Sequence, residues 1–168
     1  MIDWYELVER EGNSVWRTIH RLVRNHADAD ECFQETFMAA YRLSQREKIA
    51  NWPPLLQRLA IARAIDRLRQ RSSRSRREDP IDAAQAVTHR PDASARLELE
   101  ERAQAFRWAL AQLPAEQAEL FCLHELEGWS CQQVGDQFSM STGAVAAQLH
   151  RTRGKLKQML EPKLHPQS

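Results

Sequence analysis

The strongest constraint on the fold of this chain comes from residues 127–153, where two short helical signals flank a polar turn. Ser130 precedes Gln133 by three residues, the spacing of a capping box, in which each side chain satisfies an unpaired backbone donor. A polar break at Ser139 interrupts the first helix, and Ser141 is suited to cap a second. The second helix carries an apolar stripe at steps of four and three residues, namely Val145, Leu149, Thr152, Leu156 and Met159.

Two capped helices around a polar turn are typical of a helix-turn-helix, a unit that reads duplex DNA in many proteins. We expect Gly135, in the first helix, to let the second helix cross closely because glycine has no Cβ. The spacing alone leaves a second interpretation open, in which these are two packed helices of an all-helical domain without a DNA-binding role.

The composition favours an all-α protein of the cytoplasm. The 168 residues include only 5 glycines and are rich in the helix formers Ala, Leu, Arg and Glu. The three cysteines, Cys32, Cys122 and Cys131, form neither a CxxC pair nor a zinc pattern, so we expect reduced thiols, no metal and no cofactor. We also expect no membrane insertion, because the sequence shows neither a signal peptide nor a long apolar run.

The charges are unevenly distributed along the chain, although the net charge is only +1. Residues 1–77 hold 15 Lys and Arg against 10 Asp and Glu, whereas residues 78–112 hold 4 against 7. In residues 113–168 every Lys and Arg lies at or beyond Arg151. Such segregation indicates a surface for nucleic acid rather than a requirement of solubility.

Apolar periodicity divides the chain into two helical domains and a linker. The stretch 72–94 is rich in Ser, Arg, Asp and Pro without a sustained apolar period, so we expect a flexible linker there. Asp28 and Glu31 resemble a capping box that starts the second helix. We predict helices at about 2–25, 28–43, 53–71, 95–112 and 115–126, followed by the helix-turn-helix, with domain boundaries at 1–75, 76–94 and 95–168.

Two blocks of the chain carry sequence patterns in a defined order. Residues 29–37, ADECFQETF, match the run A-E-D-x-x-Q-E-x-F with its acids exchanged. Further matches are Trp52, Leu55, Leu56, Leu59, Ala60, Ala62, Asp66 and Arg69 in the first block and Leu113, Pro114, Glu127, Gly128, Ser130, Val134, Gly143, Val145, His150, Arg151 and Leu156 in the second.

This layout resembles the extracytoplasmic-function (ECF) sigma factors, a compact bacterial group that keeps only regions 2 and 4 of its family. The resemblance covers nearly the whole chain apart from the linker. It implies that region 2, residues 1–75, binds core RNA polymerase and melts the −10 promoter element, and that region 4, residues 95–168, reads the −35 element. It also allows an anti-sigma partner that holds the two domains together.

The resemblance assigns promoter contacts to both blocks. In the helix-turn-helix, Gln148 is suited to adenine and Arg151 to guanine or phosphate. Residues 58–77 contain eight arginines and a single acid, and this excess of positive charge suits binding of a DNA strand. Trp52 has two interpretations, stacking on an unpaired base or capping the helix start. We predict −35 contacts at Ser141, Thr142, Ala144, Ala147, Gln148, Arg151, Arg153 and Lys155, and −10 contacts at Asn51, Trp52, Arg58, Arg63, Arg67 and Arg69.

The polar face of the second helix is the expected polymerase contact. Asp30, Glu31, Gln34 and Glu35 lie on it, and acids there would complement a basic partner. The alternative is a solvated face whose acids favour the helix N-terminus. A two-metal carboxylate site would require Glu-x-x-His pairs on partner helices, which the sequence lacks.

Departures from the family pattern weaken one part of the prediction. The Thr, Ser and Arg usual in the reading helix are Ala144, Ala147 and Gln148 here, so the promoter sequence does not follow from the resemblance. Neither a phosphate-binding glycine loop nor a nucleophile–base pair indicates an enzyme. Two alternatives stay open: a helix-turn-helix regulator that acts without polymerase, and a sigma-like adaptor that binds proteins only.

Overall fold

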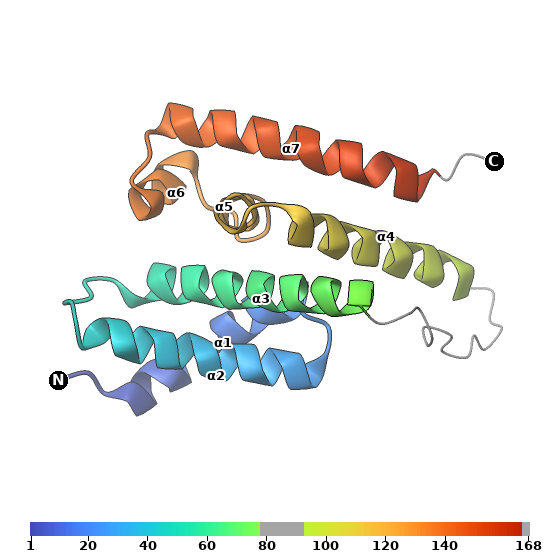
Figure 1. Cartoon of the computed structure of the whole chain (residues 1–168). Helices are drawn as coiled ribbons and strands as arrows, with labels where there is room; N and C mark the ends of the chain where they lie inside the picture. Colours follow the sequence, from blue (N-terminus) through green and yellow to red (C-terminus); the bar gives the residue numbers. More distant parts are fainter. Residues whose placement is uncertain (78–92, 166–168) are drawn as a thin grey trace.

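The computed structural model describes residues 1–77 and 93–165, and every regular element in these ranges is an α-helix (Figure 1). The predicted all-α class is therefore confirmed. Most of the expected linker, 76–94, lies outside the described residues. None of the described helices is long and apolar enough to cross a membrane. The helices are α1 Trp4–Leu22, α2 His26–Ser44, α3 Trp52–Arg77, α4 Ala93–Gln112, α5 Ala115–Glu125, α6 Cys131–Phe138 and α7 Thr142–Leu164.

The start of α2 differs from the prediction. Asn25, rather than Asp28, is the N-cap, and its side chain accepts a hydrogen bond from the backbone N–H of Asp28 at 3.1 Å. Asp28 thereby lies inside α2, where its carboxylate pairs with Arg67 and Arg71 of α3. The predicted start at Asp28 was wrong because an ion pair to another helix uses the carboxylate that the local pattern assigned to capping.

The end of α3 also differs from the prediction. The helix continues to Arg77 instead of ending at about Arg71. Contacts with α4 account for the additional turns, because the Gln112 side chain donates to Ser72 Oγ at 3.0 Å and accepts from Arg76. Local composition predicted a linker from residue 72 onward, but a neighbouring helix supplies the partners that this stretch lacks by itself.

The predicted capping of the helix-turn-helix is confirmed. Ser130 and Gln133 make both hydrogen bonds of the capping box at the start of α6. Ser141 Oγ accepts from the backbone N–H of Ala144 at 3.1 Å and so caps α7. Between the two helices, Ser139 adopts a left-handed conformation with φ 54°. The turn therefore has the polar residues at the places that the pattern indicated.

The role of Gly135 is different from the one expected. A Cβ at this position would lie 2.4 Å from the carbonyl oxygen of Met140, whereas the nearest α7 side-chain atom, on Val145, would be 3.7 Å away. The backbone of the turn therefore requires glycine here, and the crossing of α7 does not.

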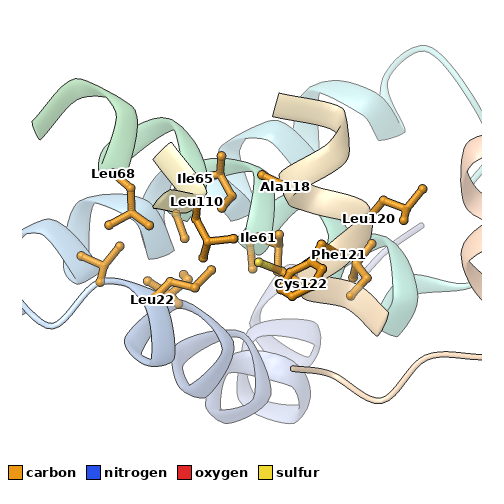
Figure 2. Packing of buried hydrophobic residues seen from close by; sticks show 14 of the residues in the cluster. Leu22, Ile61, Ile65, Leu68, Leu110, Ala118, Leu120, Phe121 and Cys122 are labelled. Carbon is orange, nitrogen blue, oxygen red and sulfur yellow. The ribbon is translucent and has the colours of Figure 1, made fainter. Parts of the chain in front are cut away.

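A single hydrophobic core joins the two halves of the chain. α3 lies between the α1–α2 pair on one side and α4 and α5 on the other (Figure 1). Ile61 and Ile65 of α3 pack with Leu110 of α4 and with Phe121 of α5 in this core (Figure 2), and none of the four is more than 7% exposed. α7 packs on α4, α5 and α6 and keeps its other side exposed.

Candidate nucleic-acid and protein interfaces

α7 presents the predicted base-reading residues on an exposed side of the helix. Ala144 and Ala147 are exposed and Gln148 is half-buried, while the apolar stripe of α7 is buried in the core. Arg151 Nη2 donates to Gln148 Oε1 at 2.7 Å. An amide and a guanidinium, the two groups suited to purine edges, therefore lie one helical turn apart on the same surface.

The start of α7 supplies donors for an anion. Ser141 and Thr142 are both exposed there. The Ser141 hydroxyl satisfies only one of the backbone N–H groups that the first turn leaves without an intrahelical partner. The remaining N–H groups and the helix dipole favour a phosphate at this position.

Two of the predicted −35 residues are engaged by α5. Arg153 pairs with Glu125, and Lys155 Nζ donates to Gln117 Oε1 at 3.1 Å. Both basic side chains thus flank the contact between α7 and α5. To reach a phosphate, each would have to exchange an internal partner for it, unlike Arg151, whose partner belongs to the reading surface itself.

Arg67 is the most highly paired of the predicted −10 arginines. It lies 3.4 Å from the carboxylate of Asp28, 2.5 Å from that of Glu31 and 3.8 Å from that of Glu35, and its side chain is only 15% exposed. Burial lowers the pKa of Arg67, but the hydrogen bond to Glu31 and the surrounding negative charges outweigh it and raise the pKa. Arg67 therefore joins α3 to the acidic side of α2.

Arg58 is engaged by α6, and Arg63 by a carboxylate of its own helix. Arg58 donates to the backbone oxygen of Gln137 at 2.6 Å, and its guanidinium lies 4.3 Å from the centre of the Phe138 ring. Arg63 pairs with Asp66 at 3.5 Å, and its Nε is buried without a hydrogen-bond partner among the described residues. Arg69, in contrast, is exposed. The predicted −10 arginines therefore do not form one free surface.

The residues at the start of α3 adopt one of the two arrangements that the sequence allowed. The Trp52 ring meets that of Trp4 edge-to-face, with centroids 5.4 Å apart. Trp52 is half-buried in this contact and caps the end of the α1–α3 bundle. Asn51 is exposed next to it. Stacking of Trp52 on a base would require the indole to leave Trp4, or to use the part of its ring that stays exposed.

An apolar groove on α1 and α2 was missing from the sequence-based site. It has a volume of about 500 Å³, and Met38 and Tyr41 in its lining are 52% and 51% exposed. Gln34, a predicted polymerase contact, also lines it. The apolar face of α2 is too wide to be covered by one packing partner. That width was the sequence feature from which an exposed apolar groove could have been predicted. The other lining residues are Trp4, Val8, Phe33, Phe37 and Arg42.

Burial raises the pKa of two groups on α5. The pKa of Glu119 is raised by burial, against the opposing charges of Arg58 and Arg63. Burial raises the pKa of the Cys122 thiol to about 12, with the nearby carboxylates of Glu127 and Glu119 adding to the effect. Cys122 is therefore a protonated thiol in the core, where it is completely buried, and Glu119 lines one pocket together with Arg58 of α3.

Models of two protein-family regions match this chain in order. The model described as "Sigma-70 region 2" matches residues 7–74, which include all of α2 and most of α1 and α3. The model described as "Sigma-70, region 4" matches residues 103–156, which contain the helix-turn-helix.

Comparisons over most of this chain agree with these matches. The RNA polymerase sigma factor CarQ of Myxococcus xanthus is 31% identical over 92% of this chain and 87% of its own length. The ECF RNA polymerase sigma factor SigE of Mycolicibacterium smegmatis is 27% identical over 95% of this chain, which spans only 62% of that relative. A crystal structure of the sigma factor RpoE from Bartonella quintana, in complex with the anti-sigma factor NepR, has the same fold, with a TM-score of 0.53 at 20% identity over 95% of this chain and 97% of that one.

Proposed function

This chain belongs to the sigma-70 family, in its ECF group, and from this premise we propose that it binds core RNA polymerase and directs it to promoters. The observation that carries the proposal is the arrangement of α7, where the half-buried Gln148 and the exposed Arg151 form a polar pair behind a capped N-terminus. Region 4 would place this surface in the major groove of the −35 element.

Region 2 would hold the −10 element through α3. Guanidinium groups bind phosphates in pairs of hydrogen bonds and stack on unpaired bases, and both contacts stabilise a separated strand. Arg69 and Asn51 are exposed and ready for such contacts, whereas Arg58 and Arg67 must first exchange internal partners. Melting would then be driven by binding energy, without hydrolysis.

The polymerase-binding surface would combine the exposed acids of α2 with the apolar groove. Charge complementarity orients two partners, but most of the affinity of an interface comes from a few large apolar side chains. Asp30 and Gln34 are exposed beside Met38 and Tyr41 on α2. An anti-sigma factor would compete for such a surface, and the related fold of RpoE is seen in complex with one.

A run-off transcription assay tests the proposal. Core polymerase with this protein, on DNA from upstream of its own gene, should give a promoter-dependent transcript that polymerase alone does not give. Binding of DNA without binding of polymerase would favour a regulator instead. Binding of polymerase without a transcript would favour an adaptor, an alternative consistent with the small side chains of Ala144 and Ala147 on the reading surface.

Substitutions on α2 separate the polymerase surface from the fold. Asp30→Lys and Tyr41→Ala should each weaken binding to core polymerase while leaving DNA binding by the full chain unchanged. Charge reversal at Glu31 or Glu35 is a less specific test, because it also removes a partner of Arg67. Normal polymerase binding by both Asp30→Lys and Tyr41→Ala would refute this surface.

A further inference from the structure

A groove lies along the C-terminal part of α1, and none of its residues is among the proposed promoter or polymerase contacts. It has a volume of about 480 Å³ and follows the last two turns of the helix. This volume is in the range of pockets that hold a small molecule. The residues that line this α1 groove are Trp16, Arg17, His20, Arg21 and Arg24.

Three exposed arginines give the α1 groove a positive charge. Arg17 and Arg21 lie one turn apart on the helix, and Arg24 follows directly after its end. Arg21 lies 3.2 Å from the Glu127 carboxylate and Arg24 lies 3.7 Å from that of Glu100. Arg17 makes no ion pair with any residue that the structure describes. Like charges one turn apart destabilise a helix, and a bound anion would remove that repulsion.

Aromatic rings line the α1 groove beside these arginines. The Trp16 indole is half-buried, and its ring centroid lies 6.1 Å from that of Phe33 and 5.4 Å from that of His26, both on α2. The His20 ring lies 5.7 Å from the indole in a tilted arrangement. The contacts with α2 fix the orientation of the indole before any ligand binds. A planar ring can therefore stack on it at little entropic cost.

Stabilisation of the helix end does not account for this groove. Cations near the C-terminus of a helix interact favourably with its dipole, which explains a basic residue at Arg21. The effect is confined to the last turn, whereas Arg17 lies one turn earlier. The dipole also gives no reason for an indole beside three guanidinium groups. A ligand that carries both a planar ring and negative charges matches both features.

We propose that the α1 groove binds a free nucleotide, with its base against Trp16 and His20 and its phosphates on the three arginines. Guanidinium groups bind phosphate oxygens in pairs of hydrogen bonds, and aromatic side chains stack on bases. Arg21 lies five residues beyond Trp16, which is about 7.5 Å along the helix axis. The sugar of a nucleotide separates its base from its phosphates, so one molecule can reach both parts of the groove.

A nucleic-acid strand offers the same chemical groups, but the surroundings of the groove favour the smaller ligand. The carboxylates of Glu100 on α4 and Glu127 after α5 lie against two of the arginines. A strand would have to continue past these negative charges, whereas a nucleotide ends inside the groove. The positive surface is therefore long enough for a few phosphates and too short for a DNA backbone.

Isothermal titration calorimetry on the full chain tests the proposal with ATP as the probe, in magnesium-free buffer at low salt. ATP should bind at one site per chain. Adenosine and inorganic triphosphate each carry only half of the recognised groups, so each should bind about five-fold more weakly than ATP, or weaker still. A short DNA single strand without a terminal phosphate should not displace ATP.

Two substitutions separate the charged part of the groove from the aromatic part. Arg17→Ala should weaken binding of ATP and of triphosphate alike by about ten-fold, because it removes one guanidinium group from the phosphates. Trp16→Leu should weaken ATP by about five-fold or more and leave triphosphate unchanged, because it removes only the stacking surface.

Controls keep these results interpretable. Arg10→Ala removes a positive charge from the same helix outside the groove, where Arg10 pairs with the neighbouring Glu11, and should change both affinities by less than about two-fold. Circular dichroism checks that every variant keeps its helices. If Trp16→Leu does not fold, His20→Ala provides the same test and leaves the contact of Trp16 with Phe33 in place.

The proposal is supported if both substitutions weaken ATP and only Arg17→Ala weakens triphosphate. Triphosphate that binds as tightly as ATP would make this a plain anion site, and displacement of ATP by the DNA strand would make it part of a nucleic-acid surface. Either result overturns the proposal, as does a lack of saturable ATP binding or ATP binding that neither substitution weakens. Run-off transcription stays independent, because the nucleotide site does not rest on the proposed sigma function.

Discussion

The arginines of α3 and of α7 are the same residue type in opposite situations. Arg67 on α3 has three carboxylates around it and is 15% exposed. Arg151 on α7 is exposed and, among the residues that the structure describes, bonds only to Gln148 of its own helix. The difference teaches that a basic sequence pattern does not define a nucleic-acid surface by itself. Internal acids can satisfy an arginine completely, and then the same side chain stabilises the fold.

Removal of one arginine from each helix tests this contrast most strongly. Arg67→Ala should lower the free energy of unfolding by roughly 2 kcal/mol, because it leaves the largely buried Asp28 carboxylate with a weaker partner. Arg151→Ala should change it by less than about 0.5 kcal/mol. Urea denaturation of both variants measures the difference, and equal losses would remove the distinction between the two helices.

The turn that orients α7 gives a second test. Gly135→Ala should cost about 1–3 kcal/mol, because its Cβ would lie 2.4 Å from the Met140 carbonyl oxygen and the turn would have to move. Gly143→Ala is the matched control: beyond the local backbone of α7, no atom in the described part of the chain lies within 4 Å of its Cβ, so the helix should gain up to about 1 kcal/mol. Thermal melting compares the two, and a similar response would show that the turn has space for a methyl group.

The reading surface of α7 predicts a third, smaller contrast. Gln148→Ala should change the preference among −35 sequences by about 1–2 kcal/mol, because an amide that contacts a base discriminates between bases. Lys157, which is exposed farther along α7, is expected to contact only the phosphate backbone. Lys157→Ala should therefore weaken binding to all sequences alike and reduce the salt slope by about one. Binding of the polymerase complex to a set of promoter variants distinguishes them. An equal effect of both substitutions on every sequence would contradict the assignment.

The carboxylate that faces the α3 arginines predicts the smallest effect, a pH dependence. The pKa of Glu119 is raised by burial, so the folded chain binds this proton more tightly than the unfolded chain. Its contribution to stability is therefore greatest below the ordinary glutamate pKa and declines as the pH rises through the raised folded value. Glu119→Gln should stabilise the chain slightly at neutral pH and leave it unchanged in acid. Denaturation of both proteins at an acidic and a neutral pH measures this difference in stability. A loss of stability in Glu119→Gln at neutral pH would contradict the prediction, because the ionised carboxylate would then stabilise the fold.

Local patterns predicted the elements of this fold better than their contacts. The capping residues Ser130 and Ser141 act within one turn of chain, so their neighbours alone specify them. The turns of α3 from Ser72 onward depend on Gln112, which is 40 residues away, and no local pattern contains that information. The packing of region 4 on α3 was missed for the same reason, because apolar residues at helical spacing do not indicate which helix will cover them.

The candidate site shows the same division. The pairing of Gln148 with Arg151 follows from helical spacing, since residues three apart lie on one face. The engagement of Arg58 by Gln137 and Phe138 could not be predicted, because it depends on how two distant helices meet. The contacts to DNA and polymerase stay predictions until the substitutions above are measured.

The shared core has a practical consequence for work on fragments of this chain. Ile61 and Ile65 are completely buried only because α4 and α5 are present in the same molecule. A truncated version that stops after α3 would expose a hydrophobic surface along that helix. A version that starts at α4 would expose the complementary hydrophobic surface on α4 and α5. We expect each fragment to aggregate when it is produced alone. Co-expression of the two fragments should let them associate and bury both surfaces again.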